Sequence, residues 1–214
     1  MEKNLTTIYL VRHGETEWNV KKLVQGHQDS PLTAEGIQQG KILGEKLKKV
    51  DFEAVFSSDS LRAHKTAQLI LLEKKIAIKT TESLRERKFG QKYEGKHSEI
   101  LNTDIRNYLA KYQHMTNAQR LKIRFTPDME SNEEVLSRVI TFLREIAVGF
   151  KGKKVLVVTH GGVMRHLLIH LGFGDHNSLS YGAINNNAMV ILQCDGIDFF
   201  VKETSGINRI MNKE

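Results

Sequence analysis

The chain of 214 residues has almost none of the features that mark a secreted or membrane protein. Its single cysteine, Cys194, excludes an intramolecular disulfide and a cluster of thiolate metal ligands, which suits a reducing cytoplasm. No apolar run approaches the roughly 18–20 residues that a membrane-spanning helix needs. The opening residues, M-E-K-N-L-T-T, contain neither the basic nor the hydrophobic stretch of a signal peptide. We therefore expect a cytoplasmic protein with no membrane partner.

What is present predicts one α/β domain over residues 1–214. Apolar residues make up 40% of the chain and charged residues 27%, as in an ordinary globular protein. Strand and helix patterns alternate, which indicates a mainly parallel sheet flanked by helices on both faces. Strands are expected at 7–11, 54–57, 76–79 and 155–159, followed by a C-terminal antiparallel hairpin of 188–193 and 199–203.

Helices are predicted between these strands, and several of their ends carry capping signals. Thr33 is the expected N-cap of the first helix, Asp59 or Ser60 that of the second, and Gly149 a C-terminal stop. The expected helices span 33–49, 60–72, 99–112, 133–148 and 163–171. Residues 97–130 interrupt the alternation, and we interpret them as a helical cap insertion over the site.

Two of the predicted strands end in a histidine followed by glycine. The strand at 7–11 leads into Arg12-His13-Gly14, and the strand at 155–159 leads into His160-Gly161-Gly162. In an open α/β sheet the carboxyl ends of the strands are where ligands bind. The sequence therefore predicts a site that contains both histidines.

The residues around these histidines suit a phosphate group. Arg12 carries a planar fork of donors that matches phosphate oxygens, and Gly14 lets the backbone approach a ligand closely. The amides that open the helix after His160 favour negative charge. Arg62 follows the strand at 54–57 and so belongs to the same end of the sheet. Together these groups resemble a clamp for a phosphoryl group.

Each candidate also has an ordinary structural interpretation. A lone histidine is usually structural, Arg62 could lie on a solvated helix face, and Glu86 could be a surface partner for Arg85 or Lys88. His166 and His170 are spaced to share a helix face, as zinc ligands do, but no third ligand accompanies them. Packing or exposure is the better interpretation for that pair.

Five sequence motifs, in order, resemble the histidine phosphatase superfamily, the group that includes cofactor-dependent phosphoglycerate mutases. The motifs are L-V-R-H-G-E-T-E-W-N at 10–19, G-H-Q-D-S-P-L-T-A-E-G at 26–36, S-S-D-S-L-R-A-H-K-T-A at 57–67, L-R-E-R-K-F-G-Q-K-Y-E-G at 84–95 and V-T-H-G-G at 158–162. One departure is Met129, which stands where the family often has a glycine before Glu-Ser. It puts the shape of that loop in question.

The resemblance implies a role for each site residue. His13 would be the nucleophile that carries the phosphoryl group, and Glu86 the proton donor to the leaving oxygen. The phosphate or substrate would be bound by Arg12, Asn19, Gln25, Gly26, Arg62, His160 and Gly161. No metal is implied, and no cofactor, except 2,3-bisphosphoglycerate if the chain is a mutase.

The positive charge of the chain is concentrated near the cap. Residues 85–125 contain ten Lys or Arg and four Asp or Glu, although the whole chain carries a net charge of only +7. Such a stretch attracts anions, whether nucleic acid, an acidic membrane or a small molecule. The hypothesis is that its basic residues lie near the pocket and favour multiply anionic substrates; they include Lys88, Lys92, Arg120, Lys122 and Arg124.

Three functions stay open, and we favour a phosphatase acting on a small-molecule phosphate ester. The segment L-V-Q-G-H-Q-D-S-P at 23–31 resembles the phosphatase branch, whereas mutases carry an aromatic-flanked Thr-Gly-Trp there. A phosphoglycerate mutase using the same phosphohistidine is the first alternative. A non-catalytic module that binds phosphoprotein or nucleic acid is the second, and a binder has no need of a nucleophile and a proton donor. The substrate and the oligomeric state are not predicted.

Overall fold

The computed structural model describes residues 4–72, 74–111 and 114–210, and six strands within them form one mixed sheet. The strands are β1 (Thr6–Arg12), β2 (Ala54–Ser58), β3 (Ile78–Thr81), β4 (Lys154–Thr159), β5 (Ile184–Cys194) and β6 (Phe199–Ile207). Their order across the sheet is β3-β2-β4-β1-β5-β6. The first four are parallel to one another, and β5 and β6 form an antiparallel hairpin beside β1. This confirms the predicted fold class.

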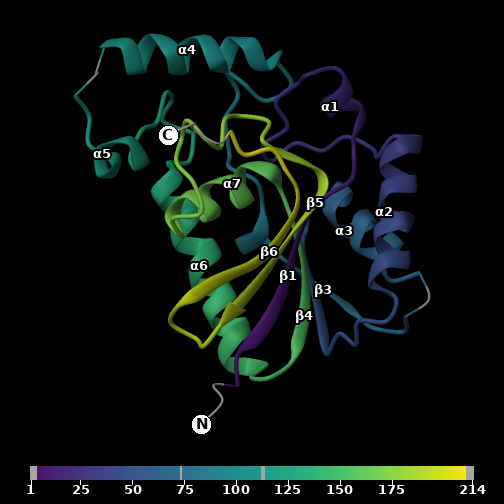
Figure 1. The fold of residues 1–214 in the computed structure, drawn as a ribbon. Coiled ribbons are helices and arrows are strands. Elements are labelled where there is room, and N and C mark those ends of the chain that lie inside the picture. The colour runs from purple at the N-terminus through teal and green to yellow at the C-terminus, as the bar shows by residue number, and fades with distance from the viewer. Residues whose placement is uncertain (1–3, 73, 112–113, 211–214) are drawn as a thin grey trace.

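Helices cover both faces of the sheet (Figure 1). The helical elements are α1 (Glu17–Val20), α2 (Ala34–Leu47), α3 (Leu61–Ile70), the 3-10 turn η1 (Glu82–Leu84), α4 (Ser98–Lys111), α5 (Asn117–Leu121), α6 (Asn132–Gly149) and α7 (Gly161–His170). The pair α2 and α3 lies on one face, and α6 and α7 lie on the other. Within the described ranges, every helix is too short or too polar to cross a lipid bilayer.

The alternation of side chains along β4 explains the two layers. Val155 and Val157 pack with α6 and α7, while Leu156 and Val158 pack with α2 and α3. Side chains of a strand point alternately to the two faces, so a continuous run of apolar residues serves both cores. The four side chains are 0% exposed. Burial on this scale holds the carboxyl ends of β1 and β4 in fixed positions.

Several predicted boundaries differ from the structure. The third strand runs over 78–81 rather than 76–79, and its place is set by pairing with β2, where Val55 lies opposite Ile78. Gly149 does not stop α6: it belongs to the helix, Phe150 is the C-cap, and the left-handed glycine is Gly152, at φ +74°. The helix predicted at 99–112 ends at Lys111, and Tyr112 lies outside the described residues.

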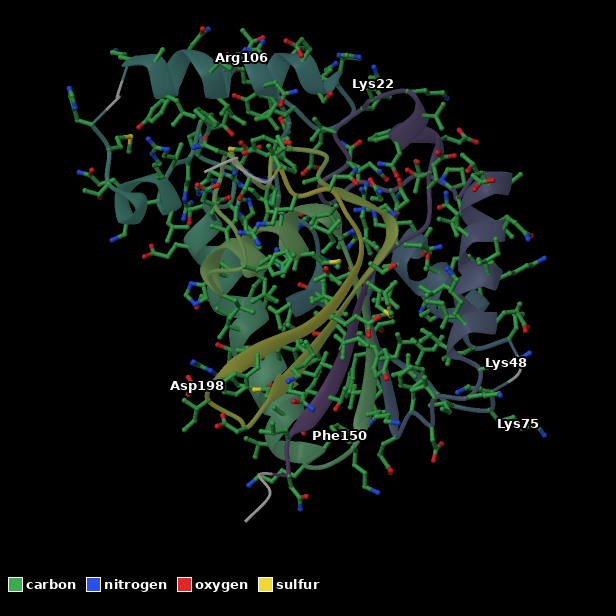
Figure 2. The ribbon with its side chains drawn as sticks, viewed as in Figure 1. Lys22, Lys48, Lys75, Arg106, Phe150 and Asp198 are labelled. Carbon is green, nitrogen blue, oxygen red and sulfur yellow. The ribbon has the colours of Figure 1, made fainter. Side chains whose placement is uncertain are left out.

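Residues 97–111 and 114–130, called the cap below, lie beside the carboxyl end of the sheet, with α4 outermost (Figure 1). A small apolar cluster joins the cap to the segments before it: Leu101 of α4 and Met129 pack with Val24 and Tyr93. Figure 2 shows Arg106 on the side of α4 that faces away from the rest of the molecule. The stretch after α4 contains a second, shorter helix, α5, which begins with a capping box at Thr116.

Candidate active site

Pairing of β1 with β4 brings the two histidines together. Arg12 lies opposite Thr159, and the His13 amide donates to the Thr159 carbonyl at 3.0 Å. The rings of His13 and His160 therefore meet edge to face, with centroids 5.2 Å apart. His13 is 3% exposed and His160 0% exposed. The pair lies at the carboxyl end of the parallel strands.

The tautomer of His13 is set by its own loop. Its Nδ1 lies 2.7 Å from the carbonyl oxygen of Gly14, and since a carbonyl only accepts, Nδ1 carries the hydrogen. The pKa of His13 lies well below its ordinary 6.5, chiefly because of burial and further because of the charges of Arg62 and Arg12. The ring is thus neutral at neutral pH and keeps a lone pair on Nε2.

Close backbone packing positions the loop that holds His13. A Cβ at Gly14 would lie 2.6 Å from the Gly36 carbonyl oxygen, and one at Gly36 would lie 2.1 Å from the Glu15 carbonyl oxygen. The start of α2, capped by the Thr33 hydroxyl as predicted, therefore fits directly against the loop. On the other side, the Gly14 amide donates to the Thr66 hydroxyl at 3.0 Å.

Arg62 is almost fully buried and is held by the segment that follows the first motif. Its guanidinium donates to the carbonyls of Gly26 and Gln28 at 2.9 and 2.7 Å, and pairs with Asp29 at 2.8 Å. The amide of Leu61 donates to the same Asp29 carboxylate at 2.6 Å. Only the Nε of Arg62 is buried without a partner.

The N-terminus of α3 is therefore capped differently from the prediction. Ser60 occupies the N-cap position, but its side chain makes no capping hydrogen bond. Asp59 does not cap the helix either, because it accepts two hydrogen bonds from Arg85 Nε and pairs with Arg85 Nη2 at 2.6 Å. Asp29, which belongs to the distant loop, caps the helix instead. Its bonds to the Leu61 amide and to Arg62 hold the loop and Arg62 together.

Arg12, at the end of β1, is held by a backbone carbonyl. Its Nη1 donates to the Ile184 carbonyl, and a Cβ at Gly161 would lie 3.0 Å from its Nε. Its pKa is lowered to about 10, chiefly by burial; Glu86 opposes this shift and Arg62 adds to it. Arg12 thus remains a cation at neutral pH. Gly161 opens α7 and leaves room for its guanidinium.

Glu86 binds backbone amides rather than a surface lysine or arginine. Its Oε2 accepts from the Gly162 amide, and its Oε1 from the Arg87 amide, both at 2.9 Å. Gly162 permits this approach, since a Cβ there would lie 2.4 Å from Oε1. The carboxyl group is thereby fixed at the start of α7, directly after His160.

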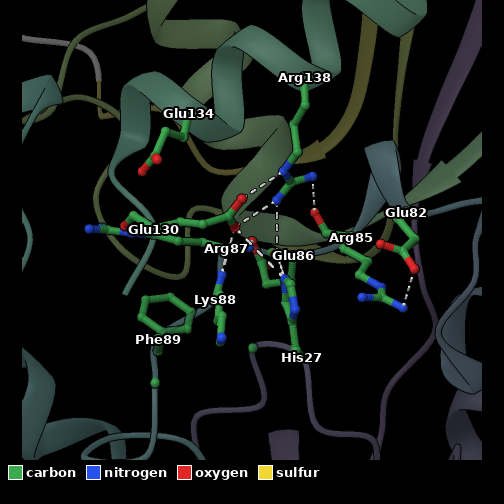
Figure 3. Close-up of polar contacts among 12 residues, drawn as sticks. His27, Glu82, Arg85, Glu86, Arg87, Lys88, Phe89, Glu130, Glu134 and Arg138 are labelled. Atoms are coloured by element: carbon green, nitrogen blue, oxygen red, sulfur yellow. Dashed lines mark hydrogen bonds and ion pairs between the residues drawn. The ribbon is translucent and has the colours of Figure 1, made fainter. Parts of the chain in front are cut away.

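Arg138 of α6 holds the backbone that carries Glu86 (Figure 3). It donates to the carbonyls of Ser83, Arg85 and Glu86 at 3.0, 2.7 and 3.0 Å, and to both oxygens of Glu130 at 3.0 Å. Burial by itself would raise the pKa of Glu130, but hydrogen bonds from Arg138 and the Lys88 amide bring that pKa below its ordinary value.

A cavity of about 190 Å³ opens onto these groups. Its lining residues are Gly26, His27, Asp29, Asp59, Ser60, Arg85, Glu86 and His160. His27 Nε2 donates to the Glu86 carbonyl at 3.0 Å. The His160 ring lies 3.5 Å from the Ser60 hydroxyl, and its pKa is well below 6.5, first because of burial and next because of Arg62. His160 has the buried side chain of this lining, and the other side chains are more exposed and include the carboxylates of Asp29, Asp59 and Glu86.

The remaining predicted site residues lie between β1 and α2, with Asn19 in α1 and Gln25 and Gly26 in the loop that follows it. Asn19 accepts at Oδ1 from the Thr16 amide and from Asn186 Nδ2, both at 3.1 Å. Gln25 donates to the Thr16 hydroxyl at 2.9 Å, and its buried Oε1 has no partner. Gly26 has φ +54°, and a Cβ there would lie 2.1 Å from Glu94 Oε1. The structure thus places Asn19 and Gln25 in the frame of the loop.

The basic residues in and near the cap differ in what they contact. Lys92 pairs with Asp104 at 2.6 Å, Lys122 with Glu133 at 3.9 Å, and Arg124 with Glu134. These pairs lie on the surface. Arg120 instead lines a second cavity, beneath the cap.

Sequence reasoning did not identify the residues that position the site, and Asp29, Thr66 and Arg138 are the chief examples. Asp29 stands inside the motif at 26–36 that resembles the family, so this motif could have indicated that Asp29 belongs to the site. Thr66 and Arg138 lie on amphipathic helices, where nothing local distinguishes them. Met129, which put the shape of its loop in question, is buried, and Ser131 after it begins α6 with a capping box.

Comparisons with known proteins agree on one family. A profile of the histidine phosphatase superfamily (branch 1) matches residues 8–205. The uncharacterized phosphatase PhoE of Bacillus subtilis is 30% identical over 181 residues, which cover 85% of each chain. The solved structure of Bacillus stearothermophilus YhfR is 34% identical, with a TM-score of 0.78 over 92% of this chain and 95% of that one. A phosphoglycerate mutase structure from Bacillus anthracis is 28% identical, with a TM-score of 0.82 over 96% and 95%.

Proposed function

The chain is an enzyme that belongs to the histidine phosphatase superfamily (branch 1), and from this premise we propose that it hydrolyses small anionic phosphate monoesters through a phosphohistidine on His13. The observation that carries the proposal is the hydrogen bond from His13 Nδ1 to Gly14, which leaves Nε2 free to attack. The reaction also needs positive groups around the phosphoryl oxygens and a proton donor for the leaving oxygen. The nearby cations supply the first, and the fixed carboxyl group of Glu86 supplies the second.

In the first step, His13 Nε2 attacks the phosphorus atom and the bond to the ester oxygen breaks. Glu86, in its protonated form, donates a proton to the departing alkoxide, which leaves as an alcohol. Arg12, Arg62 and His160 hold the three remaining phosphoryl oxygens, where negative charge is spread in the transition state. Gly161 lets Arg12 lie close to them.

In the second step, water attacks the phosphohistidine while the Glu86 carboxylate accepts a proton from it. The bond between phosphorus and Nε2 breaks, inorganic phosphate leaves, and His13 and Glu86 return to their starting forms. All chemistry is carried by side chains, so we propose a reaction that requires no metal and no cofactor. Asn19, Gln25 and Gly26 keep the loop after β1 in position around the phosphate.

A phosphoglycerate mutase is the second candidate. The observation that favours it is the match to the mutase structure from Bacillus anthracis, whose TM-score of 0.82 exceeds the 0.78 of YhfR. A mutase would return the phosphoryl group to the bound acid before water could attack. The two candidates therefore differ only in what receives the group from His13.

A panel of phosphate esters, assayed with EDTA present, tests the proposal. We expect release of inorganic phosphate from at least one ester, and its loss by about 10⁴-fold or more in His13→Ala, because the nucleophile is removed. His170→Ala, which changes an exposed histidine of α7, is the matched control. Isomerisation of 3-phosphoglycerate that needs 2,3-bisphosphoglycerate and releases no phosphate would establish the mutase instead. Activity that is abolished by EDTA would contradict the metal-free mechanism.

A further inference from the structure

A second cavity, of about 270 Å³, lies beneath the cap and is separate from the cavity at His160. Its charged lining consists of Arg87, Arg120 and Arg165, with His176 beside them. No Asp or Glu is among the described residues that line it, and it shares no lining residue with the cavity at His160. Three guanidinium groups thus converge without a carboxylate in the wall.

Arg165 gives the strongest evidence for a bound anion, because it is 4% exposed and one of its nitrogens has no hydrogen-bond partner. Its Nε donates to the Leu179 carbonyl at 2.5 Å, and its Nη2 lies 3.4 Å from the His176 carbonyl. Its Nη1 is buried with no partner, and no ion pair is found for it among the described residues. A buried cation in this condition is costly unless a charged ligand completes its bonds.

Of the other two arginines, Arg87 is held by the backbone and Arg120 has a nitrogen without a partner. Arg87 is also 4% exposed and donates only to backbone carbonyls, those of Glu130 at 2.7 Å and Ile123 at 3.0 Å. The Nε of Arg120 is buried without a partner. Burial lowers the pKa of both Arg87 and Arg165. An anion in the cavity would offset that loss of hydration.

The apolar part of the wall comes mainly from the cap, while Asn132, Asn177 and Ser180 add uncharged polar groups from outside it. Ile105 and Leu109 of α4 face the cavity, together with Ile123 and Phe125. Tyr181 closes another side, with its ring centroid 4.4 Å from the Arg165 guanidinium. A bare inorganic ion would use only the basic part of such a site, whereas an anionic group on an apolar body would use both.

We propose that this cavity is a second binding site, which takes a small organic anion: a carboxylate or phosphoryl group carried on an aromatic or branched aliphatic body. The forked guanidinium groups match the paired oxygens of such anions. The site adjoins the catalytic groups through one peptide unit, because the Arg87 amide donates to Glu86 while its side chain lines the cavity. Binding itself does not require turnover, so it is measured independently of the proposed reaction.

Calorimetric titration of the full chain with benzoate tests the site, with phenylphosphonate as a second anion and benzamide as the neutral counterpart. Each titration is run with and without orthovanadate, a phosphate analogue for the site at His13. We expect one benzoate to bind per chain, benzamide to bind at least tenfold more weakly, and orthovanadate to change the benzoate Kd by less than twofold. Absence of benzoate binding, equal binding of benzamide, or competition by orthovanadate would each overturn the proposal.

Substitutions locate the bound anion. Arg165→Met and Arg120→Met should each weaken benzoate binding at least tenfold. Arg120 is less buried than Arg165, so Arg120→Met tests the location of the anion if Arg165→Met does not fold. The control is Arg144→Met, since Arg144 also donates to a backbone carbonyl, that of Ile197, but is exposed and lies on α6 away from the cavity. Unchanged benzoate affinity in the folded arginine variants would place the anion elsewhere and refute the site.

Discussion

Arg62 and Arg106 are both helical arginines, and the protein holds them in opposite ways. The Arg62 side chain is 1% exposed and is bound by two carbonyls and Asp29, all from a loop far away in the chain. The Arg106 side chain is 62% exposed and pairs only with Glu99 and Thr103 on its own helix (Figure 2). The first arrangement fixes a charge at one point in space, and the second leaves it free to move.

The same contrast separates the two regions to which these arginines belong. Around His13, charged groups are buried and positioned by backbone atoms of different elements. In the cap, charges pair on the surface, and a small apolar cluster attaches α4. Exposed ion pairs contribute little to stability and are screened by salt. We infer that the region around His13 tolerates little change, whereas the surface of the cap tolerates much.

The largest expected difference is in activity. Arg62→Met should lower kcat/KM for the best ester of the panel by about 10²–10³-fold, because a preorganised donor to the transferring phosphoryl group is lost. Arg106→Met should stay within about twofold, since its charge is exposed and screened. Steady-state kinetics measure both, and circular dichroism checks that the Arg62 variant is folded. A loss of less than tenfold in folded Arg62→Met would show that Arg62 is not part of the clamp.

The next contrast compares two arginine–glutamate pairs near the N-terminal end of α6. Arg138→Met should reduce the free energy of unfolding by about 2 kcal/mol, because three carbonyls and the partly buried Glu130 lose their donor. Arg124→Met breaks only the exposed pair with Glu134 and should cost less than about 0.5 kcal/mol. Urea denaturation gives both values. Equal losses would mean that the network below Glu86 is no stronger than a surface pair.

The buried histidines make stability depend on pH. Burial lowers the pKa of His166 well below 6.5, so the unfolded chain binds its proton at a higher pH than the folded chain does. Stability is therefore retained above pH 6.5 and falls as the pH drops below it, by up to about 1.2 kcal/mol per such histidine between pH 7 and 5.5. Between pH 7 and 5.5, the free energy of unfolding of His166→Gln should therefore fall by about 1.2 kcal/mol less than that of the parent chain. An identical pH dependence in the two proteins would contradict a neutral buried His166.

The smallest expected difference concerns the capping box, a motif found both in the cap and at the start of α6. Ser131 begins α6 and Thr116 begins α5, each with a full capping box. Ser131→Ala should lower the free energy of unfolding by about 1 kcal/mol, since α6 belongs to the main core. Thr116→Ala should change it by less than about 0.3 kcal/mol, because opening of the cap is local rather than global. Similar losses in urea denaturation would show that the cap unfolds together with the sheet.

Much of the frame was predictable because it depends on neighbours in the chain. The apolar run of β4, the Thr33 cap of α2 and the hairpin of β5 and β6 all arise from patterns within a few residues. The histidines at the ends of β1 and β4 were predicted to share a site for a different reason, since parallel strands bring their carboxyl ends together.

Errors appeared where local signals were weak or misleading. β3 is an edge strand with no buried residue, so its position follows from pairing with β2 rather than from an apolar pattern. Gly149 looked like a stop signal, but a glycine is also tolerated inside a helix, and α6 continued through it. Neither position could be decided from the residues on either side.

The sequence by itself determined the strand ends, the two histidines, the basic and acidic candidates around them and the family they resemble. Tertiary structure alone decided that Asp29 caps α3, that Glu86 binds the amide of Gly162, and that three arginines converge beneath the cap. The physical reason is distance along the chain. Patterns of neighbouring residues set secondary structure, whereas a buried charge finds its partner only when the fold brings remote backbone atoms within hydrogen-bonding reach.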